Sequence, residues 1–335
     1  MKKMKISDFN LNNIIDKLKN TGEITITVIG DYSLDKYVYS NPERDELSVE
    51  TGLVAYQIHD TAIYPGIGGT VTNNLRSVGA NVICIGLAGN DGDGFELIRE
   101  LKKTGADTEN MIISDEFQTN TYLKPMRGTN KLNSTEINRL DFRNFQATSG
   151  IVEDEIINNL RKAVLRSQGV IITDQFVDRN RGVITDRVRA EISRIALDYP
   201  SVFFCADSRG FIDEFENVMQ KCNESETKKI TKRTENKNSI KARFVTLGEK
   251  GIKIYKEKET VLIPSFKATP PLDFCGAGDA TTAGIVTGLV LGLKIEEAAL
   301  LGACMAAITI EQIGVTGVAS IEQITDRIKG NIEIM

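Results

Sequence analysis

Histidine is almost absent from this sequence, in which His59 is the single histidine among 335 residues. A zinc-protease motif needs two histidines on one helix, so that motif is excluded, and a His-dependent triad has one candidate base. Residues 54–59 alternate between apolar and polar side chains, which favours a strand position for His59. Catalysis is therefore expected to depend on carboxylates.

Paired cysteines and a basic excess are also missing. The five cysteines lie far apart and form no C-x-x-C pair, which excludes a zinc ribbon and a disulfide framework and favours reduced thiols. The formal net charge of −5 argues against a general nucleic-acid binder. We expect a small-molecule ligand, and any anionic ligand would need a local binding cradle.

No hydrophobic run is long enough for a membrane span. Residues 283–310 are apolar but are interrupted by Lys294, Glu296 and Glu297, which predicts two core helices. The basic residues 1–5 are followed by no apolar segment, so no signal peptide is predicted and a cytoplasmic location is expected. A hydrophobic content of 41% and a charged content of 26% are ordinary for a globular protein.

The chemically informative stretch is residues 272–284, which runs into the first of these helices. Gly276, Ala277 and Gly278 carry almost no side chain, so their backbone N–H groups could close around an anion where the helix begins. Asp279 follows in the first helical turn, where the helix dipole favours its ionised form. A base beside an anion cradle suits phosphoryl transfer. The alternative is an ordinary helix cap behind a glycine-rich turn.

The run Asp273-x-x-Gly-Ala-Gly-Asp279 resembles the signature of the ribokinase-like (PfkB) carbohydrate kinases. The resemblance implies that Asp279 is the catalytic base and that Gly276 to Gly278 form the anion hole. Phe274 and Cys275 stand where that family often has threonine.

An early strand ends in a second candidate motif. Residues 24–29 read as a buried strand that is closed by Gly30 and Asp31, at the strand end where ligands bind in α/β sheets. Asp31 and Asp35 could each accept hydroxyl hydrogen bonds, and a simple strand-ending turn is the alternative. The segment resembles the family's first motif, whose aspartates bind the sugar.

A glycine pair follows in residues 64–74. Gly68 and Gly69 would let the backbone approach a ligand, and Asn73 would project an amide from the helix that comes next. No Gly-Lys-Ser/Thr ends the segment, so it is not a Walker A loop. It resembles the sugar-side Gly-Gly motif of the family.

Two extended segments, residues 36–62 and 119–143, lie outside the predicted main sheet. Their similar character suggests that they pair as one β lid, as in the family. The second segment contains Lys124 and Arg139 and is most similar to the heptose-phosphate kinases, although Met126 replaces a usual basic residue there. Lys124 and Arg139 would neutralise a phosphate on the substrate or would lie on a solvated face.

Helices and strands alternate from residue 153: helix to 167, strand 170–173, helix 181–197, strand 202–206. This alternation predicts a parallel sheet with right-handed crossovers. Asp174 and Asp207 each end one of these strands at the expected ligand-bearing edge, and we assign Asp174 to substrate binding.

The nucleotide side is predicted from two further motifs. Asn223 and Glu226 resemble the family's Asn-x-x-Glu motif, which organises magnesium through water, although Cys222 replaces the usual proline. Thr246, Gly248 and Gly251 match its Thr-x-Gly-x-x-Gly nucleotide loop. The seven basic residues between 228 and 243 are interpreted as a solvated loop or helix.

These motifs together predict a ribokinase-like α/β fold with a central, mainly parallel sheet, flanking helices and a small β lid. The expected division is residues 1–35, 63–118 and 144–335 for the kinase domain, and 36–62 and 119–143 for the lid. We expect transfer of the γ-phosphoryl group of ATP, with Mg²⁺, to a hydroxyl of a sugar or sugar phosphate. A monovalent cation near Asp273 and a homodimer formed through the lid are further expectations. A nucleoside kinase and a catalytically silent sugar-binding regulator are the alternatives.

Overall fold

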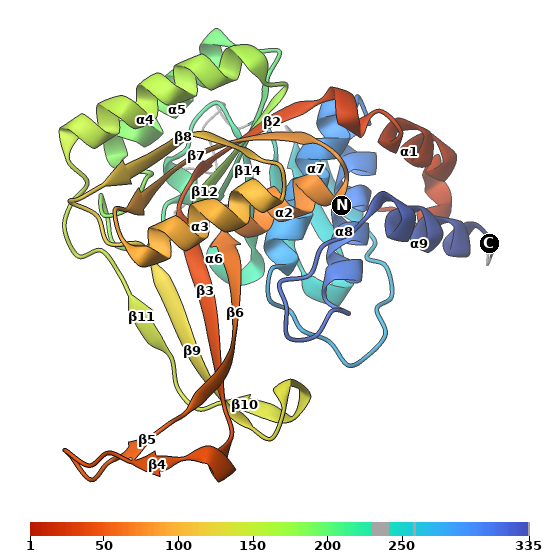
Figure 1. Ribbon diagram of the computed structural model, residues 1–335. Coiled ribbons are helices and arrows are strands. Elements are labelled where there is room, and N and C mark those ends of the chain that lie inside the picture. The colour runs from red at the N-terminus through yellow and green to blue at the C-terminus, as the bar shows by residue number, and fades with distance from the viewer. Residues whose placement is uncertain (229–240, 257–258, 334–335) are drawn as a thin grey trace.

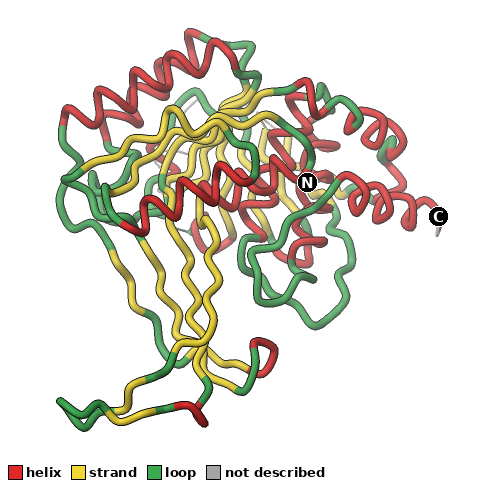
Figure 2. The backbone as a smooth tube through the Cα atoms, viewed as in Figure 1, coloured by secondary structure: helices red, strands yellow, loops and turns green. Residues whose placement is uncertain are grey.

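The computed structural model describes residues 1–228, 241–256 and 259–333. Most of the basic run between 228 and 243 therefore lies outside the described residues. The chain forms a body of helices around a large sheet, and a small sheet projects from one side of that body (Figures 1 and 2).

Among the described residues the large sheet has ten strands, and the expected mainly parallel arrangement is confirmed. Seven neighbouring strands, from β8 to β15, run parallel, and only β16 runs antiparallel to both of its neighbours. In spatial order the strands are β1 (Lys2–Lys3), β17 (Glu259–Ile263), β16 (Ile252–Lys256), β15 (Arg243–Thr246), β14 (Met219–Asn223), β13 (Phe203–Ser208), β12 (Gly169–Asp174), β2 (Thr25–Gly30), β7 (Asn81–Gly89) and β8 (Asp107–Ser114).

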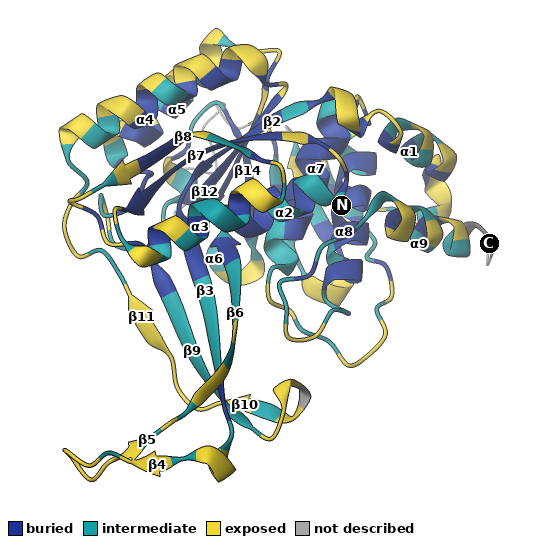
Figure 3. Cartoon of the chain, in the orientation of Figure 1, coloured by how far each residue is buried: buried dark blue, intermediate teal, exposed yellow. Residues whose placement is uncertain are grey.

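Helices cover both faces of this sheet, and each face has its own apolar core. On one face pack α4 (Gly150–Ala163) and α5 (Asp186–Asp198). The other face is covered by α1 (Leu11–Leu18), α2 (Gly68–Ser77), α3 (Gly92–Lys103), α7 (Ala277–Val290), α8 (Ile295–Thr309) and α9 (Ile321–Glu333). The central strands are buried on both sides as a result (Figure 3).

Helix α5 begins later than the sequence pattern predicts. Residues 181–197 were expected to be helical, but Thr185 is the N-cap, because its Oγ1 accepts the N–H of Val188 at 3.2 Å. Asn180, just before the expected start, has a positive φ of 63°, which lies outside the helical region. The preceding residues form a loop over the strand ends instead.

The small sheet is the lid. Its strands are β3 (Tyr32–Ser40), β6 (Ile58–Ile67), β9 (Thr121–Gly128), β10 (Ser134–Glu136) and β11 (Leu140–Phe142), and a hairpin of β4 (Glu46–Leu47) and β5 (Val54–Ala55) lies at its far end. The two separated segments do pair, because β3 lies between β6 and β9. The lid strands extend beyond residues 36–62, since β3 begins only one residue after β2 ends.

Helices α7 and α8 pack closely against each other. A Cβ atom on Gly284 would lie 2.7 Å from Cα of Gly302, and one on Gly288 would lie 2.8 Å from Cα of Ala298, so glycine permits the close approach. These apolar helices have 14 and 15 residues. No helix in the described part of the chain is long and apolar enough to cross a bilayer.

The topology places the functional groups at one edge. The chain runs from β2 outward to β7 and β8, then returns to β12 on the other side of β2 and continues to β13, β14 and β15. The order therefore reverses beside β2, and ligands of open α/β sheets bind at such a point, outside the carboxyl ends of the strands.

Candidate active site

The turn before α7 has the geometry of an anion cradle. Gly276 has a positive φ of 77°, a conformation that favours glycine, and the first helical hydrogen bond runs from Ala280 N to Gly276 O at 2.9 Å. In the described part of the chain the N–H groups of Gly278 and Asp279 donate to no backbone acceptor. The helix start therefore offers two unpaired donors on consecutive residues, directly after Ala277, whose own N–H donates to the carbonyl oxygen of Phe274 at 3.3 Å.

Asp279 is half-buried at this helix start and is not paired. Within residues 1–228, 241–256 and 259–333 its carboxylate makes no hydrogen bond and no ion pair. Burial raises the pKa of Asp279 to about 7; Asp207 acts in the same direction, while Lys221 and Arg209 oppose it. A carboxylate with a pKa near neutrality and no partner can take up a proton from a substrate.

A buried ion pair lies behind the turn. Asp207 and Lys221 are register partners on β13 and β14, and Nζ of Lys221 lies 2.7 Å from Oδ2 of Asp207. The hydroxyl of Thr282 in α7 donates to the same oxygen at 3.1 Å. The sequence analysis placed Asp207 at the sheet edge but did not single out Lys221.

The lid presents a second ion pair to this edge. Nζ of Lys124 lies 2.8 Å from Oδ1 of Asp35 and donates to the hydroxyl of Tyr37 at 2.9 Å. Burial opposes the charge on Lys124, but Asp35 and Tyr37 outweigh it, so the pKa of Lys124 is raised. The charge of Asp35 also raises the pKa of Asp279, so the two carboxylates interact electrostatically.

Tyr122 on lid strand β9 interacts electrostatically with three arginines. Burial raises the pKa of Tyr122, and Arg143, Arg209 and Arg139 oppose that rise. Arg139 stacks 5.0 Å above the Tyr122 ring and pairs with Asp141. The guanidinium of Arg209 is exposed and finds no acceptor among the described residues.

Of these arginines the sequence analysis identified only Arg139. Arg209 carries a recognisable signal, because it follows Asp207 by two residues at the end of a parallel strand. Arg143 carries none, since it lies in the connection from β11 to α4 and pairs with Asp178 at 2.9 Å.

Asp31 and Asp174 lie at the predicted strand ends but point into the protein. Asp31 is 1% exposed, and its carboxylate accepts backbone N–H groups from Gln175, Phe176 and Val183 at 2.8 to 3.0 Å. Burial raises the pKa of Asp31 to about 6, although these three N–H groups lower it. These contacts hold the loop between β12 and α5, and they leave Asp31 no open oxygen for a sugar.

Asp174 is similarly enclosed. Its Oδ2 accepts from Ser208 at 2.8 Å and from Arg189 at 3.3 Å, and the side chain is 3% exposed. Burial, and next the charge of Asp31, raises the pKa of Asp174 to about 7. In this structure Asp174 binds neighbouring side chains and is not open to a substrate.

Close packing also explains why positions 68 and 69 are glycines. A Cβ atom on Gly68 would lie 2.9 Å from the carbonyl oxygen of Asp31, and one on Gly69 would lie 2.3 Å from Cβ of Pro65. Asn73 follows on α2, and its buried Oδ1 has no hydrogen-bond partner in the described structure. An unsatisfied amide oxygen is costly, so a ligand hydroxyl at this position would be favourable.

The nucleotide-side residues meet at the ends of β14 and β15, where Asn223 and Thr246 are register partners. Asn223 caps the short helix α6 (Glu224–Thr227), and Oε2 of Glu226 accepts the N–H of Asn223 at 2.8 Å. Gly248 and Gly251 have positive φ values of 60° and 93°, which explains the two glycines of the following loop.

Asp273 is engaged in its own turn. Oδ1 accepts the N–H of Cys275 at 3.0 Å, and Oδ2 accepts the N–H of Gly314 at 3.3 Å. It therefore ties the anion-cradle turn to the segment after α8.

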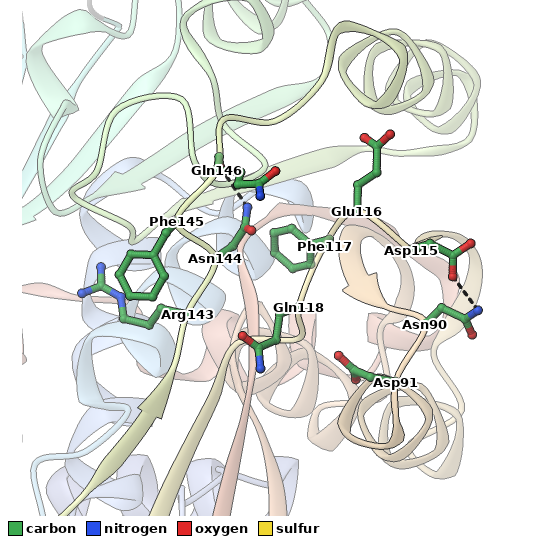
Figure 4. Close-up of a pocket in the computed structure, with 10 residues that line it drawn as sticks. All are labelled: Asn90, Asp91, Asp115, Glu116, Phe117, Gln118, Arg143, Asn144, Phe145 and Gln146. Atoms are coloured by element: carbon green, nitrogen blue, oxygen red, sulfur yellow. Dashed lines mark hydrogen bonds between the residues drawn. The ribbon is translucent and has the colours of Figure 1, made fainter.

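A separate surface pocket lies beside the root of the lid, between the β7–α3 turn and the connection from β11 to α4 (Figure 4). Phe117 and Phe145 line it together with amide and acidic side chains. None of the site residues predicted from the sequence lines it, but Arg143, which also acts on Tyr122, does.

Comparisons with known proteins show the family and the fold of the chain. Residues 26–322 match the family model described as pfkB family carbohydrate kinase. The bifunctional protein HldE of Sulfurimonas denitrificans is 26% identical, over 90% of this chain and 63% of that protein. HldE of Nitrobacter hamburgensis is also 26% identical, over 91% of this chain and 63% of that protein. The chain thus spans about 63% of the length of these relatives.

Solved structures share the fold at lower identity. Arabidopsis thaliana ribokinase complexed with ribose and ATP is 16% identical with a TM-score of 0.67, covering 91% of this chain and 99% of the other. A nucleoside kinase of Methanocaldococcus jannaschii is 20% identical with a TM-score of 0.61, covering 91% and 98%. The chain therefore has the ribokinase fold.

Proposed function

Because the chain belongs to the pfkB family of carbohydrate kinases, we propose that it transfers the γ-phosphoryl group of ATP to a hydroxyl of a phosphorylated sugar. The observation that carries the proposal is the unpaired, half-buried Asp279 beside the free N–H groups of the α7 start. An ATP-dependent enzyme of this kind is expected to act in the cytoplasm.

In the proposed reaction Asp279 accepts the proton of the attacking hydroxyl. The unpaired N–H groups of Gly278 and Asp279, at the turn that begins with Gly276, stabilise the oxygens of the phosphoryl group as it moves, a contribution of about 3 kcal/mol per donor in comparable sites. Asp35 and Asn73 orient the acceptor, through the carboxylate on β3 and the unpaired amide oxygen on α2. The residues thus divide into a base, an anion cradle and acceptor ligands.

The arginines around Tyr122 support a phosphate on the acceptor. Arg209 is exposed and unpaired, while Arg139 and Lys124 lie on the same lid and carry further positive charge. Guanidinium groups bind phosphate oxygens through paired N–H donors. A phosphorylated sugar of the heptose class, which the resemblance of the second lid segment implies, would match this distribution of charge.

The nucleotide is proposed to bind at the ends of β14 and β15, against Asn223, Thr246, Gly248 and Gly251. Glu226 has one oxygen that is not used in its capping contact, so it fits a magnesium ion held largely by ATP and water. Magnesium would neutralise phosphate charge during transfer. Asp273 is the candidate for a monovalent cation, although both of its oxygens accept backbone N–H groups here.

The direct test is ADP release with a panel of sugar phosphates, free sugars and nucleosides, each with ATP and magnesium. Turnover with a sugar phosphate, and at most weak turnover with the free sugar, is the expected result. Selective turnover of nucleosides would favour the nucleoside-kinase alternative. Binding of a sugar phosphate without any ADP release would favour the silent regulator.

Arg209→Gln provides a sharper prediction for the acceptor phosphate. We expect the KM for the sugar phosphate to rise about 10- to 100-fold, because a hydrogen bond to a charged group contributes about 1.5 to 3 kcal/mol. The KM for ATP and the turnover of any free sugar should change little. Steady-state kinetics with each substrate varied in turn measures this. The matched control is Arg194→Gln on α5, which removes the same charge at an exposed position.

A rise confined to the KM for ATP would instead assign Arg209 to the nucleotide phosphates. An unchanged KM for every substrate would remove it from the site.

We also propose that the lid forms a homodimer contact. Its far end exposes a group of apolar side chains that would otherwise face water: Leu47, Val49, Leu53, Val54, Tyr56 and Ile58. Analytical ultracentrifugation should show a dimer that Val49→Asp and Leu53→Asp dissociate. A monomer at all accessible concentrations would contradict this assembly.

A further inference from the structure

Lys221 places a positive charge directly behind the anion-cradle turn. Its side chain is 6% exposed, and it lies in the middle of β14, two residues before Asn223. A Cβ atom at position 278 would lie only 2.8 Å from Nζ of Lys221 and 3.9 Å from its Cε. The ammonium therefore lies against the backbone of Gly278, and the glycine leaves the space that the ammonium occupies.

The ammonium of Lys221 has N–H donors that are not used in its contact with Asp207. A lysine carries three N–H donors, and within the described part of the chain its one acceptor is Oδ2 of Asp207. A buried ion pair is often no more stabilising than apolar residues of similar size. Stability of the fold is therefore a weak explanation for the presence of this ion pair. The unused donors lie beside the turn at which the phosphoryl group is proposed to pass.

Acidic groups surround Lys221 on several elements. Burial opposes its charge, but Asp207, and then Asp279 and Glu226, raise the pKa of Lys221. In return Lys221 lowers the pKa of Asp279, and Asp207 raises it. Lys221 thus interacts electrostatically with the candidate base Asp279, with the magnesium candidate Glu226 and with its counter-ion Asp207.

We infer that Lys221 is a positioning residue for phosphoryl transfer. Its ammonium, fixed by Asp207, adds positive charge at the turn from Gly276 to Gly278 and helps to keep Asp279 ionised. Phosphoryl transfer depends mainly on such pre-arranged charge, because the moving group spreads negative charge over its oxygens. The inference rests on the proposed kinase function and adds a residue to it.

The test compares two variants that separate this role from simple stabilisation of the fold. Lys221→Met removes the charge but leaves Asp207 without its partner. The double variant Asp207→Asn with Lys221→Met removes both charges and keeps the volumes similar, so it should fold even where the single variant does not. Lys253→Met on β16 is the matched control for replacing a lysine by methionine.

We expect kcat to fall about 100-fold in both variants, as for loss of one oxyanion donor, while the KM for the acceptor stays the same. In Lys221→Met the acid limb of the pH profile of kcat should move to higher pH. In the double variant it should return towards the wild type, because the opposing charge of Asp207 is also gone. Arg209 and Asp35, which also act on Asp279, remain in both variants.

The outcomes keep the two proposals distinguishable. A folded double variant whose kcat is within about twofold of the active wild type would limit Lys221 to a structural role and overturn this inference alone. A wild type that transfers phosphate to no acceptor would overturn the proposed function, and this inference with it.

Discussion

Replacing Asp279 with asparagine is expected to remove nearly all phosphoryl transfer while ATP still binds. The amide keeps the shape of the side chain but cannot accept the proton of the attacking hydroxyl. General bases contribute about 10²- to 10⁴-fold to rate, so kcat should fall by about 10³-fold. A coupled ADP-release assay measures the loss, and calorimetry of ATP binding should show a similar Kd for both proteins.

The pH dependence follows from the pKa of Asp279, which burial raises to about 7. The base must be ionised to act, so wild-type kcat/KM should decrease as the pH falls below about 7. The residual activity of Asp279→Asn should lose this dependence. The matched control is Asp198→Asn, which removes a carboxylate from the exposed end of α5.

Stability provides an independent measurement at the same position. An unfolded aspartate has a pKa of about 3.9, so between that pH and about 7 the folded protein holds the Asp279 proton more tightly than the unfolded chain does. Raising the pH through this range therefore destabilises the wild type at this site. Asp279→Asn should unfold at higher urea concentration than the wild type at pH 8. Full activity in this variant would falsify the role of Asp279 as the base.

Asp207→Asn is expected to cause the largest loss of stability among these variants. It leaves the buried ammonium of Lys221 without its counter-charge, and breaking a buried ion pair from one side costs about 3 to 5 kcal/mol. Thr282 also loses a charged acceptor. Urea unfolding followed by circular dichroism measures the change in the free energy of unfolding. Asp16→Asn, which removes an exposed pair with Lys19, should cost less than about 1 kcal/mol.

The pH dependence of this loss has a defined sign. The raised pKa of Lys221 means that its stabilising contribution is present below the unfolded lysine pKa, about 10.4, and decreases as the pH rises through the folded value. The difference between the wild type and Asp207→Asn should therefore shrink at strongly alkaline pH. Adding Lys221→Met to Asp207→Asn should restore much of the stability at neutral pH. If Asp207→Asn alone were as stable as the wild type, the ion pair would have no energetic importance.

Local sequence patterns predicted the parts of the fold that depend on neighbouring residues. The small residues before Asp279, the alternation after residue 153 and the two extended segments were sufficient to predict the helix start, the parallel sheet and the lid. The expected family membership is confirmed as well. Strands β8 and β14 were not predicted, because each mixes polar and apolar side chains without a clear period.

The sequence could not distinguish an open carboxylate from a buried one. Asp31, Asp174 and Asp207 each lie at the end of a predicted strand and look equivalent. Their surroundings come from distant segments, since Val183, which donates to Asp31, is 152 residues away in the chain. Lys221 was overlooked for the same reason: its function depends on the register that places it opposite Asp207.

The lid is attached in a way that affects how it can bend. Only Asp31 separates the last residue of β2 from the first residue of β3, and three backbone amides clamp that residue from a loop on the other side. The base of the lid is therefore held in place, and we expect the displacement of the lid to increase with distance from the large sheet. Hydrogen–deuterium exchange should accordingly be slowest in residues 30–34 and fastest in the β4–β5 hairpin.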